Sequence, residues 1–250
     1  MGVNPVEALT QHLADDAPPL ATCLLLLSEA LTGRQDAVEV GTGLLDELAH
    51  DITDKTVSGV VRHLFDESQF LGDVEDYHSP ENSFLDRVLE RRLGMPITLS
   101  AVVAEVGHRV GVGMHLVGMP GHVLVGIDND PGRYVDAFGG TELDEVGVRG
   151  RFESIFGADA SLAPKALRPI DTLAVVNRVC NNLTRSWADR EPTALNRLLD
   201  VRAALPASAR ERQMLIGLAE ARGRFDLSAR LRNDVDPTDP AINRLWARLN

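Results

Sequence analysis

The spacing of apolar residues changes abruptly at Gly111. Before this glycine, residues 96–110 place apolar side chains at helical spacing, and Pro96 stands in the first turn, where proline is favoured. After it, three short segments alternate with a period of two, as strands do: residues 114–119, 122–128 and 133–137. The turn-forming segment DNDPG, residues 128–132, joins the last two segments as a hairpin. The sequence therefore predicts a helix packed on a small antiparallel sheet.

Helical patterns occupy most of the remaining chain. Apolar residues recur at helical spacing in three early segments: residues 20–31, 38–52 and 56–70. The segment NSFLDRVLERRLG adds a short helix, with Asn82 or Ser83 as its cap and Gly94 as its stop. Residues 72–82 have the proline, glycine and acidic content of a loop. The predicted fold class is therefore α+β and mainly helical.

The end of the chain carries a degenerate repeat. Everything after Pro164 has helical spacing, and the pair Pro206-Ala207 recurs 34 residues later as Pro240-Ala241. A period of 34 residues is typical of tetratricopeptide helix pairs, in which each pair buries one face on its neighbour. We therefore expect two domains. Residues 1–160 contain the sheet and the N-terminal helices, and residues 165–250 form a tetratricopeptide-like helical domain.

Charge and cysteine content exclude several classes of protein. The 37 acidic residues outnumber the 25 basic ones, and the resulting net charge of −12 repels nucleic-acid phosphates and anionic lipid. The most apolar stretch, residues 21–30, falls well short of the roughly 20 residues of a membrane-spanning helix, and no basic segment precedes it. Cys23 and Cys180 are too few and too far apart for a disulfide framework or a zinc cluster. We expect a cytoplasmic protein without nucleic-acid or membrane partners.

Three features of the middle third point to one site. A helix begins at Pro96, His122 lies on a predicted strand, and Asp136 lies on the next strand. Across the hairpin, His122 and Asp136 lie nearly opposite each other, close enough for a hydrogen bond. A histidine oriented by a carboxylate is the base half of a nucleophile–base–orienter triad. The third member would be a thiol or hydroxyl at the helix N-terminus, where the helix dipole lowers the pKa of a cysteine.

Three specific motif blocks occur between residues 76 and 140: N-S-F-L, R-R-L-G-M-P-I-T-L-S and P-G-H. Through them, the sequence resembles the core-2 branch of the transglutaminase-like superfamily, of the bacterial invasion-regulator type with a tetratricopeptide-like C-terminus. The resemblance runs from about Val57 to the end of the chain and implies a transglutaminase-like, papain-like core. It places His122 and Asp136 at the family's His and Asp positions. Where active members have Gly-x-Cys, this chain has Gly94-Met95-Pro96, so the resemblance puts Pro96 at the nucleophile position.

Other interpretations of the same region stay open. Thr98 and Ser100 carry hydroxyls near the start of the helix and could replace the missing thiol, although such side chains more often cap backbone amides. His122 could be a structural or binding histidine, and Asp136 could cap a turn. His115 could join these two residues in a metal site of two histidines and one carboxylate. Apart from that alternative, the sequence predicts no metal and no cofactor.

Three functional classes are compatible with the sequence. The first is a non-catalytic, pseudoenzyme-like module that binds or regulates a protein or peptide partner, with Pro96 at the nucleophile position. The second is an acyl-transfer or hydrolase-type enzyme, in which His122 and Asp136 act with a non-cysteine nucleophile or water. The third is a helical-repeat adaptor with a passive middle domain. The absent cysteine favours the first or third class, and helical repeats favour protein or peptide partners.

Overall fold

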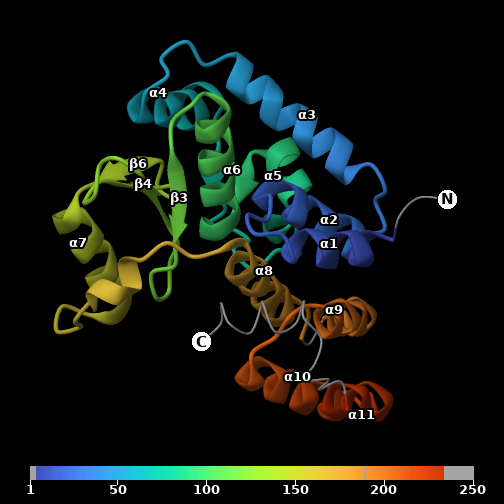
Figure 1. Cartoon of the computed structure of the whole chain (residues 1–250). Helices are drawn as coiled ribbons and strands as arrows, with labels where there is room; N and C mark the ends of the chain where they lie inside the picture. The colour runs from blue at the N-terminus through green and yellow to red at the C-terminus, as the bar shows by residue number, and fades with distance from the viewer. Residues whose placement is uncertain (1–3, 189, 234–250) are drawn as a thin grey trace.

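The computed structural model describes residues 4–188 and 190–233. Its fold is α+β and mainly helical, with a four-stranded antiparallel sheet at one side of the molecule (Figure 1). The α-helices are α1 (Pro5–Leu13), α2 (Leu20–Thr32), α3 (Ala37–His50), α4 (Val57–Arg62), α5 (Leu85–Arg91), α6 (Pro96–Arg109), α7 (Glu145–Phe156), α8 (Thr172–Trp187), α9 (Pro192–Ala204), α10 (Ala209–Ala221) and α11 (Phe225–Asn233). The strands are β1 (Leu71–Gly72), β2 (Leu93–Gly94), β3 (Met114–Val117), β4 (Leu124–Ile127), β5 (Tyr134–Asp136) and β6 (Thr141–Leu143).

The antiparallel sheet is formed by consecutive strands in the order β3-β4-β5-β6. Strands β4 and β5 pair antiparallel around the turn at residues 128–132, which confirms the predicted hairpin. Successive side chains of a strand point to opposite faces. Val125 belongs to the main core with α6, whereas its neighbour Leu124 packs in a separate cluster with Val148 of α7. The sheet therefore lies between α6 and α7 (Figure 1).

Helix α6 begins at Pro96, as the sequence predicts, and contacts from an earlier loop fix its first turn. The Thr98 hydroxyl donates to the carbonyl oxygen of Asn82 at 2.7 Å and accepts from the amide of Met95 at 3.3 Å. Asn82 lies in the short helix Pro80–Ser83. The start of α6 is thereby held against the loop that precedes α5.

Helix α5 differs from the prediction at both ends. Phe84, rather than Asn82 or Ser83, is the N-cap residue, and no side chain caps the helix. The side chain of Asn82 does not cap the helix, because the oxygen that would accept a backbone N–H accepts instead from Arg91 Nη1 at 3.1 Å. At the other end, Arg92 takes a left-handed conformation with φ 59° and ends the helix, so that Gly94 lies in β2 instead.

Other elements differ from the sequence prediction in extent. The predicted helix over residues 56–70 is divided into α4 and a π-helix, His63–Glu67. Strands β3, β4 and β5 are each shorter than their predicted segments. Helices α1 and α7 and strand β6 are absent from the prediction, since few of their side chains are buried and their apolar patterns are short.

The helices of the C-terminal part pack consecutively, from α8 through α11 (Figure 1). Leu183 of α8 and Leu198 of α9 belong to the main core, whereas α10 and α11 form a second cluster with Leu199. The repeat copy at Pro240-Ala241 lies outside the described residues. The tetratricopeptide-like organisation and the domain boundary between residues 160 and 165 therefore stay predictions.

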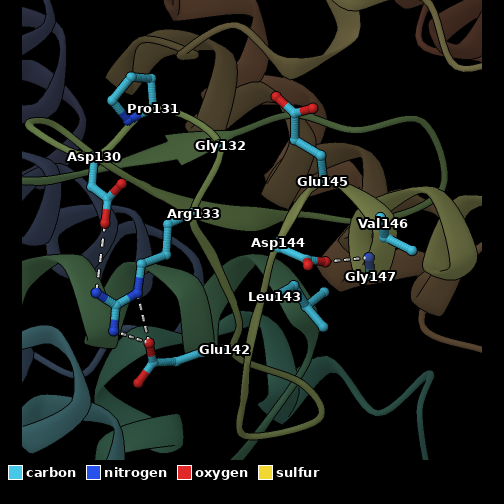
Figure 2. Close-up of a pocket in the computed structure, with 10 residues that line it drawn as sticks. All are labelled: Asp130, Pro131, Gly132, Arg133, Glu142, Leu143, Asp144, Glu145, Val146 and Gly147. Atoms are coloured by element: carbon cyan, nitrogen blue, oxygen red, sulfur yellow. Dashed lines mark hydrogen bonds and ion pairs between the residues drawn. The ribbon is translucent and has the colours of Figure 1, made fainter.

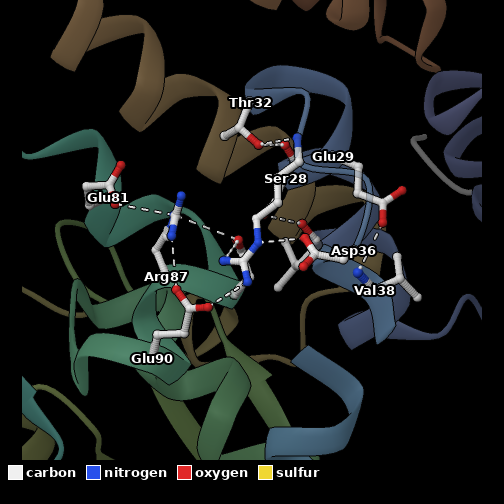
Figure 3. A network of polar contacts seen from close by, with 11 residues as sticks. Ser28, Glu29, Thr32, Asp36, Val38, Glu81, Arg87 and Glu90 are labelled. Carbon is white, nitrogen blue, oxygen red and sulfur yellow. Dashed lines mark hydrogen bonds and ion pairs between the residues drawn. The ribbon is translucent and has the colours of Figure 1, made fainter. Parts of the chain in front are cut away.

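A network of ion pairs joins the end of α2 to α5 (Figure 3). Three carboxylates surround the Arg34 guanidinium: Asp36 at 2.8 Å, Asp86 at 3.2 Å and Glu90 at 2.6 Å. The Asp86 side chain is completely buried, and its other cationic neighbour, Arg87, lies 3.9 Å away. Arg34 therefore provides the closest counter-charge to a carboxylate that water does not reach.

Candidate functional site

His122 and Asp136 are hydrogen-bonded to each other in a buried position. His122 Nε2 lies 2.8 Å from Asp136 Oδ1, and the two side chains are 7% and 0% exposed. Because Asp136 engages Nε2, the second ring nitrogen, Nδ1, is free of hydrogen bonds to any residue that the structure describes. The sequence predicts this contact, and the catalytic role of the pair stays a prediction.

His122 reaches Asp136 from a turn and not from a strand. Strand β4 begins at Leu124, and its register continues to place Leu124, not His122, opposite Asp136. The expectation that His122 lies on a strand, nearly opposite Asp136, is therefore wrong, because the strand begins two residues after His122. The turn is closed by the His122 amide, which donates to the carbonyl oxygen of Met119 at 3.1 Å. Gly121 in this turn has φ 72°, a left-handed conformation that favours glycine.

Asp136 is held in its ionised form by several neighbours. Burial opposes its ionisation, but the hydrogen bond from His122 and the charges of His122 and Arg151 outweigh that effect and hold the pKa of Asp136 below its ordinary value. Arg151 Nη2, from α7, lies 2.6 Å from Asp136 Oδ2. The amides of Phe138 and Gly139 donate to Oδ1 at 3.1 and 3.3 Å. An ionised Asp136 orients the imidazole and favours the tautomer with its proton on Nε2.

A cavity of about 270 Å³ opens beside His122 at the start of α6. Pro96 and Ile97 of α6 line one part of it, and Tyr77 lines another. A further part is one face of α8, whose lining side chains are all polar: Arg178, Asn181, Asn182 and Arg185. The cavity thus joins the predicted His–Asp pair to a helix outside the predicted site.

Pro96 lines the cavity, whereas the two hydroxyls considered as substitute nucleophiles do not. The Thr98 hydroxyl is buried and donates to the carbonyl oxygen of Asn82 at 2.7 Å. The Ser100 hydroxyl is also buried and donates to the carbonyl oxygen of Val123 at 3.4 Å. Both hydroxyls bond to backbone, so neither is placed to attack a group bound beside His122.

The two cysteines also lie away from the cavity lining. Cys23 is buried in α2 and Cys180 is buried in α8. Burial raises the pKa of each thiol to about 12. Because the thiolate is the reactive form, both cysteines are poor nucleophiles at neutral pH.

His115 does not join His122 and Asp136. Its Nδ1 lies 2.7 Å from Asp128 Oδ1 in a separate, partly exposed pair. Within the described part of the chain, no three His, Cys, Asp or Glu side chains gather as a metal site would need. The metal alternative raised by the sequence therefore has no geometric support among these residues.

The part of the cavity that α8 provides is absent from the site predicted from the sequence. The four lining residues occupy positions i, i+3, i+4 and i+7, which fall on one face of a helix: Arg178, Asn181, Asn182 and Arg185. Arg178 also holds the His122 turn, because its Nη2 donates to the carbonyl oxygens of Met119 and His122 at 3.0 and 3.1 Å. The signal that could have identified this face is a polar stripe on a helix whose other face is apolar.

A second hollow, of about 760 Å³, lies at the 128–132 turn and differs in its chemistry. Figure 2 shows the Arg133 guanidinium between Asp130 and Glu142. Arg133 Nη1 lies 3.6 Å from Asp130 Oδ2, and the same guanidinium pairs with Glu142. Asp144 and Glu145 add further negative charge, so this hollow is acidic and its arginine is already paired.

We expect Asp136→Asn to destabilise the protein at neutral pH and to lose that effect in acid. A lowered carboxyl pKa contributes stability above the unfolded-state value of about 3.9, and that stability disappears as the pH falls through the lower folded-state pKa. In urea unfolding at pH 7, the free energy of unfolding of Asp136→Asn should be about 2 kcal/mol lower than that of wild type. This difference should become smaller below about pH 4. The matched control is Asp128→Asn, in the exposed pair with His115, which should cost less than about 1 kcal/mol. A difference for Asp136→Asn that stays constant to acid pH would contradict this account.

Comparison with known proteins agrees with this fold. Residues 35–181 match the family model described as the transglutaminase-like superfamily. The matched range contains the whole sheet, α6 and the His–Asp pair, and it ends within α8. The chain belongs to the transglutaminase-like superfamily.

Several curated proteins are similar to parts of the chain. It is 34% identical over 168 residues to a UPF0162 protein of Xylella fastidiosa (strain 9a5c), which covers 62% of this chain and 59% of that relative. It is 27% identical over 134 residues to a UPF0162 protein of Vibrio cholerae, with 52% and 50% covered. It is 32% identical over 85 residues to F-box only protein 21 of Homo sapiens, with 30% and 14% covered. In each case the chain covers less than two thirds of the relative.

No solved structure matches the chain. Among the described residues, every helix is too short or too polar to cross a lipid bilayer.

Proposed function

We propose that this chain is a non-catalytic member of the transglutaminase-like superfamily that binds a protein or peptide partner at the His122 cavity. In this proposal Pro96 occupies the position at which active members carry cysteine, and the His122–Asp136 pair serves binding. The finer assignment is to the bacterial invasion-regulator type, acting as a regulator in the cytoplasm.

One observation carries the proposal: Pro96 and His122 line the same cavity, and the described residues of that lining include no cysteine, serine or threonine. Thr98 and Ser100 are engaged with backbone carbonyl groups, and the two thiols are buried elsewhere. Tyr77 lines the cavity, but burial raises the pKa of its hydroxyl, which keeps it protonated. A histidine base without a side-chain nucleophile in reach does not perform covalent acyl transfer.

The His–Asp pair is suited to recognition as well as to catalysis. With its proton on Nε2, a neutral His122 presents Nδ1 as a hydrogen-bond acceptor. Asn181 and Asn182 add amide groups that can donate and accept on the opposite part of the lining. A few fixed polar groups around a cavity of this size are typical of ligand sites that select by hydrogen bonding.

The C-terminal helices support a macromolecular partner. We infer that α8 to α11 are tetratricopeptide-like, because they pack consecutively and the sequence repeats with the period of that family. Helix α8 buries Leu183 in the main core and lines the cavity with its polar face. A partner that binds the helical array can therefore also reach the His122 cavity.

A hydrolase-type activity that uses water is the second candidate. It is favoured by the free Nδ1 of His122 beside a cavity of about 270 Å³, which has room for water. A histidine oriented by a carboxylate can activate a water molecule as a general base. This candidate predicts turnover that depends on both His122 and Asp136.

An activity screen separates the two candidates. We expect wild type, His122→Ala and Asp136→Ala to give the same background with acyl and peptide substrates. Circular dichroism should first establish that both variants are folded. Turnover by wild type that disappears in both folded variants would overturn the binding proposal in favour of the hydrolase candidate.

A further inference from the structure

The His122 cavity is cationic in a chain that is acidic overall. The chain has 37 acidic and 25 basic residues, yet the described residues that line this cavity include Arg178 and Arg185 and no carboxylate. The hollow at the 128–132 turn, by contrast, is lined by four acidic residues and one arginine. The cavity is therefore a local region of positive charge that favours an anionic ligand.

The two arginines lack carboxylate partners within the described chain. Arg178 is partly buried, and its Nη2 is fixed by the carbonyl oxygens of Met119 and His122 at 3.0 and 3.1 Å. Arg185 is exposed at the cavity and makes no ion pair with any residue described. A guanidinium that is partly removed from water without a counter-ion gains most from a ligand that brings one.

One further donor of the same lining favours an anion. Helix α6 begins at the cavity, and the backbone amide of Ile97 in its first turn has no partner within the helix. Such amides, together with the helix dipole, attract negative charge. His122 is only 7% exposed, and its Nδ1 has no hydrogen bond among the residues described. A neutral His122 presents this nitrogen as an acceptor, so an N–H group of the ligand can bond to it.

An apolar surface adjoins the cavity. Ile155 and Phe156, at the end of α7, are 41% and 50% exposed. Both lie beside Gly121, which lines the cavity: a Cβ added at Gly121 would lie 3.0 Å from the Ile155 side chain and 3.2 Å from the Phe156 side chain. A small inorganic anion has no apolar group to pack on this surface, whereas a peptide can place an apolar side chain next to its carboxylate.

We propose that the cavity binds the carboxylate of an acidic peptide segment, with Arg178 and Arg185 beside the carboxylate and an apolar peptide side chain on Ile155 and Phe156. The inference rests on the proposed binding function of the same site and names the chemistry of its partner. The carboxylate belongs either to an Asp or Glu side chain or to a peptide C-terminus, since both present the same charged group.

The experiment is a selection of peptides by the full chain. Two random heptapeptide libraries are used, one with free and one with amidated C-termini, which separates the two sources of carboxylate. If the carboxylate is a side chain, we expect the amidated library to yield peptides rich in Asp or Glu beside an apolar residue. If it is the peptide C-terminus, we expect only the library with free C-termini to yield binders. Neutralising the carboxylate, by Glu→Gln or by amidation, should weaken binding by about tenfold or more in calorimetry.

Charge reversal identifies the cavity as the site of binding. Arg185→Glu should also weaken the selected peptide by about tenfold or more, because it places a carboxylate beside the ligand. Arg62→Glu is the matched control, since Arg62 is an exposed arginine at the end of α4 that does not line the cavity, and it should leave the affinity unchanged.

Several outcomes would overturn the inference. Equal affinity for the charged and neutral peptides, equal loss in the two arginine variants, no enrichment from either library, or tighter binding of inorganic phosphate than of any peptide would each do so. Selection of neutral peptides whose affinity falls in His122→Ala would contradict the requirement for a carboxylate but would support the proposed binding function. Cleavage of a selected peptide that requires His122 would instead contradict the proposed function.

Discussion

A cysteine introduced by Pro96→Cys should react with iodoacetamide on the order of 100-fold faster than Cys23 or Cys180. Position 96 opens α6 and lines the cavity with His122, and both a helix N-terminus and a neighbouring histidine lower a thiol pKa. Burial, by contrast, raises the pKa of Cys23 and Cys180 to about 12. Mass spectrometry of labelled peptides measures the three rates in one sample.

The histidine contribution can be separated from simple exposure of the new thiol. In the double variant Pro96→Cys, His122→Ala, the new thiol should react with iodoacetamide much more slowly than in Pro96→Cys alone. It should also need a higher pH to react. Pro96→Cys should lower the free energy of unfolding by only about 0.5–1 kcal/mol. Proline at the first helical position donates no backbone hydrogen bond, so the substitution breaks none. A new thiol that reacts no faster than the two native cysteines would show that His122 and Asp136 are not arranged as a triad remnant.

Arg34→Met should lower the free energy of unfolding by about 3 kcal/mol. Arg34 Nη1 lies 3.2 Å from Asp86 Oδ2, and the Asp86 side chain has no exposure to solvent. Removing the guanidinium leaves a buried carboxylate whose next cation, Arg87, is 3.9 Å away. Urea unfolding at pH 7 measures the loss.

Two controls test whether burial is the cause. The double variant Arg34→Met, Asp86→Leu should recover much of the stability, because it removes the buried carboxylate together with the guanidinium that pairs with it. Arg224→Met should cost less than about 1 kcal/mol, since its partners Asp200 and Asp226 are 50% and 71% exposed. Equal losses for Arg34→Met and Arg224→Met would contradict the account.

Local patterns predict the elements that carry the site. Pro96 at a first-turn position and the apolar residues that follow it are sufficient to locate the start of α6. The turn at residues 128–132 and the alternation around it are sufficient to predict the β4–β5 hairpin. Both features depend on neighbours in sequence, and both are confirmed.

Features that depend on tertiary contacts are not visible in the sequence. The contact between His122 and Asp136 is present, but it arises from the Gly121 turn and not from strand register. The α8 part of the cavity depends on how that helix packs, although its polar stripe is detectable in retrospect. Asn82 fails as a cap because its side-chain oxygen accepts from Arg91, a contact that sequence spacing does not reveal.

The central claim is that the His122 site binds without performing chemistry, and exchange of heavy oxygen from labelled water tests it most directly. Attack by an activated water, or a reversible acyl intermediate, would put labelled oxygen into the carboxyl group of a bound peptide. A selected peptide is incubated with wild type or His122→Ala in labelled water, and its mass is then measured by mass spectrometry. The account predicts a peptide that stays intact and gains no more label with wild type than with His122→Ala. Label or cleavage that requires His122 would contradict it.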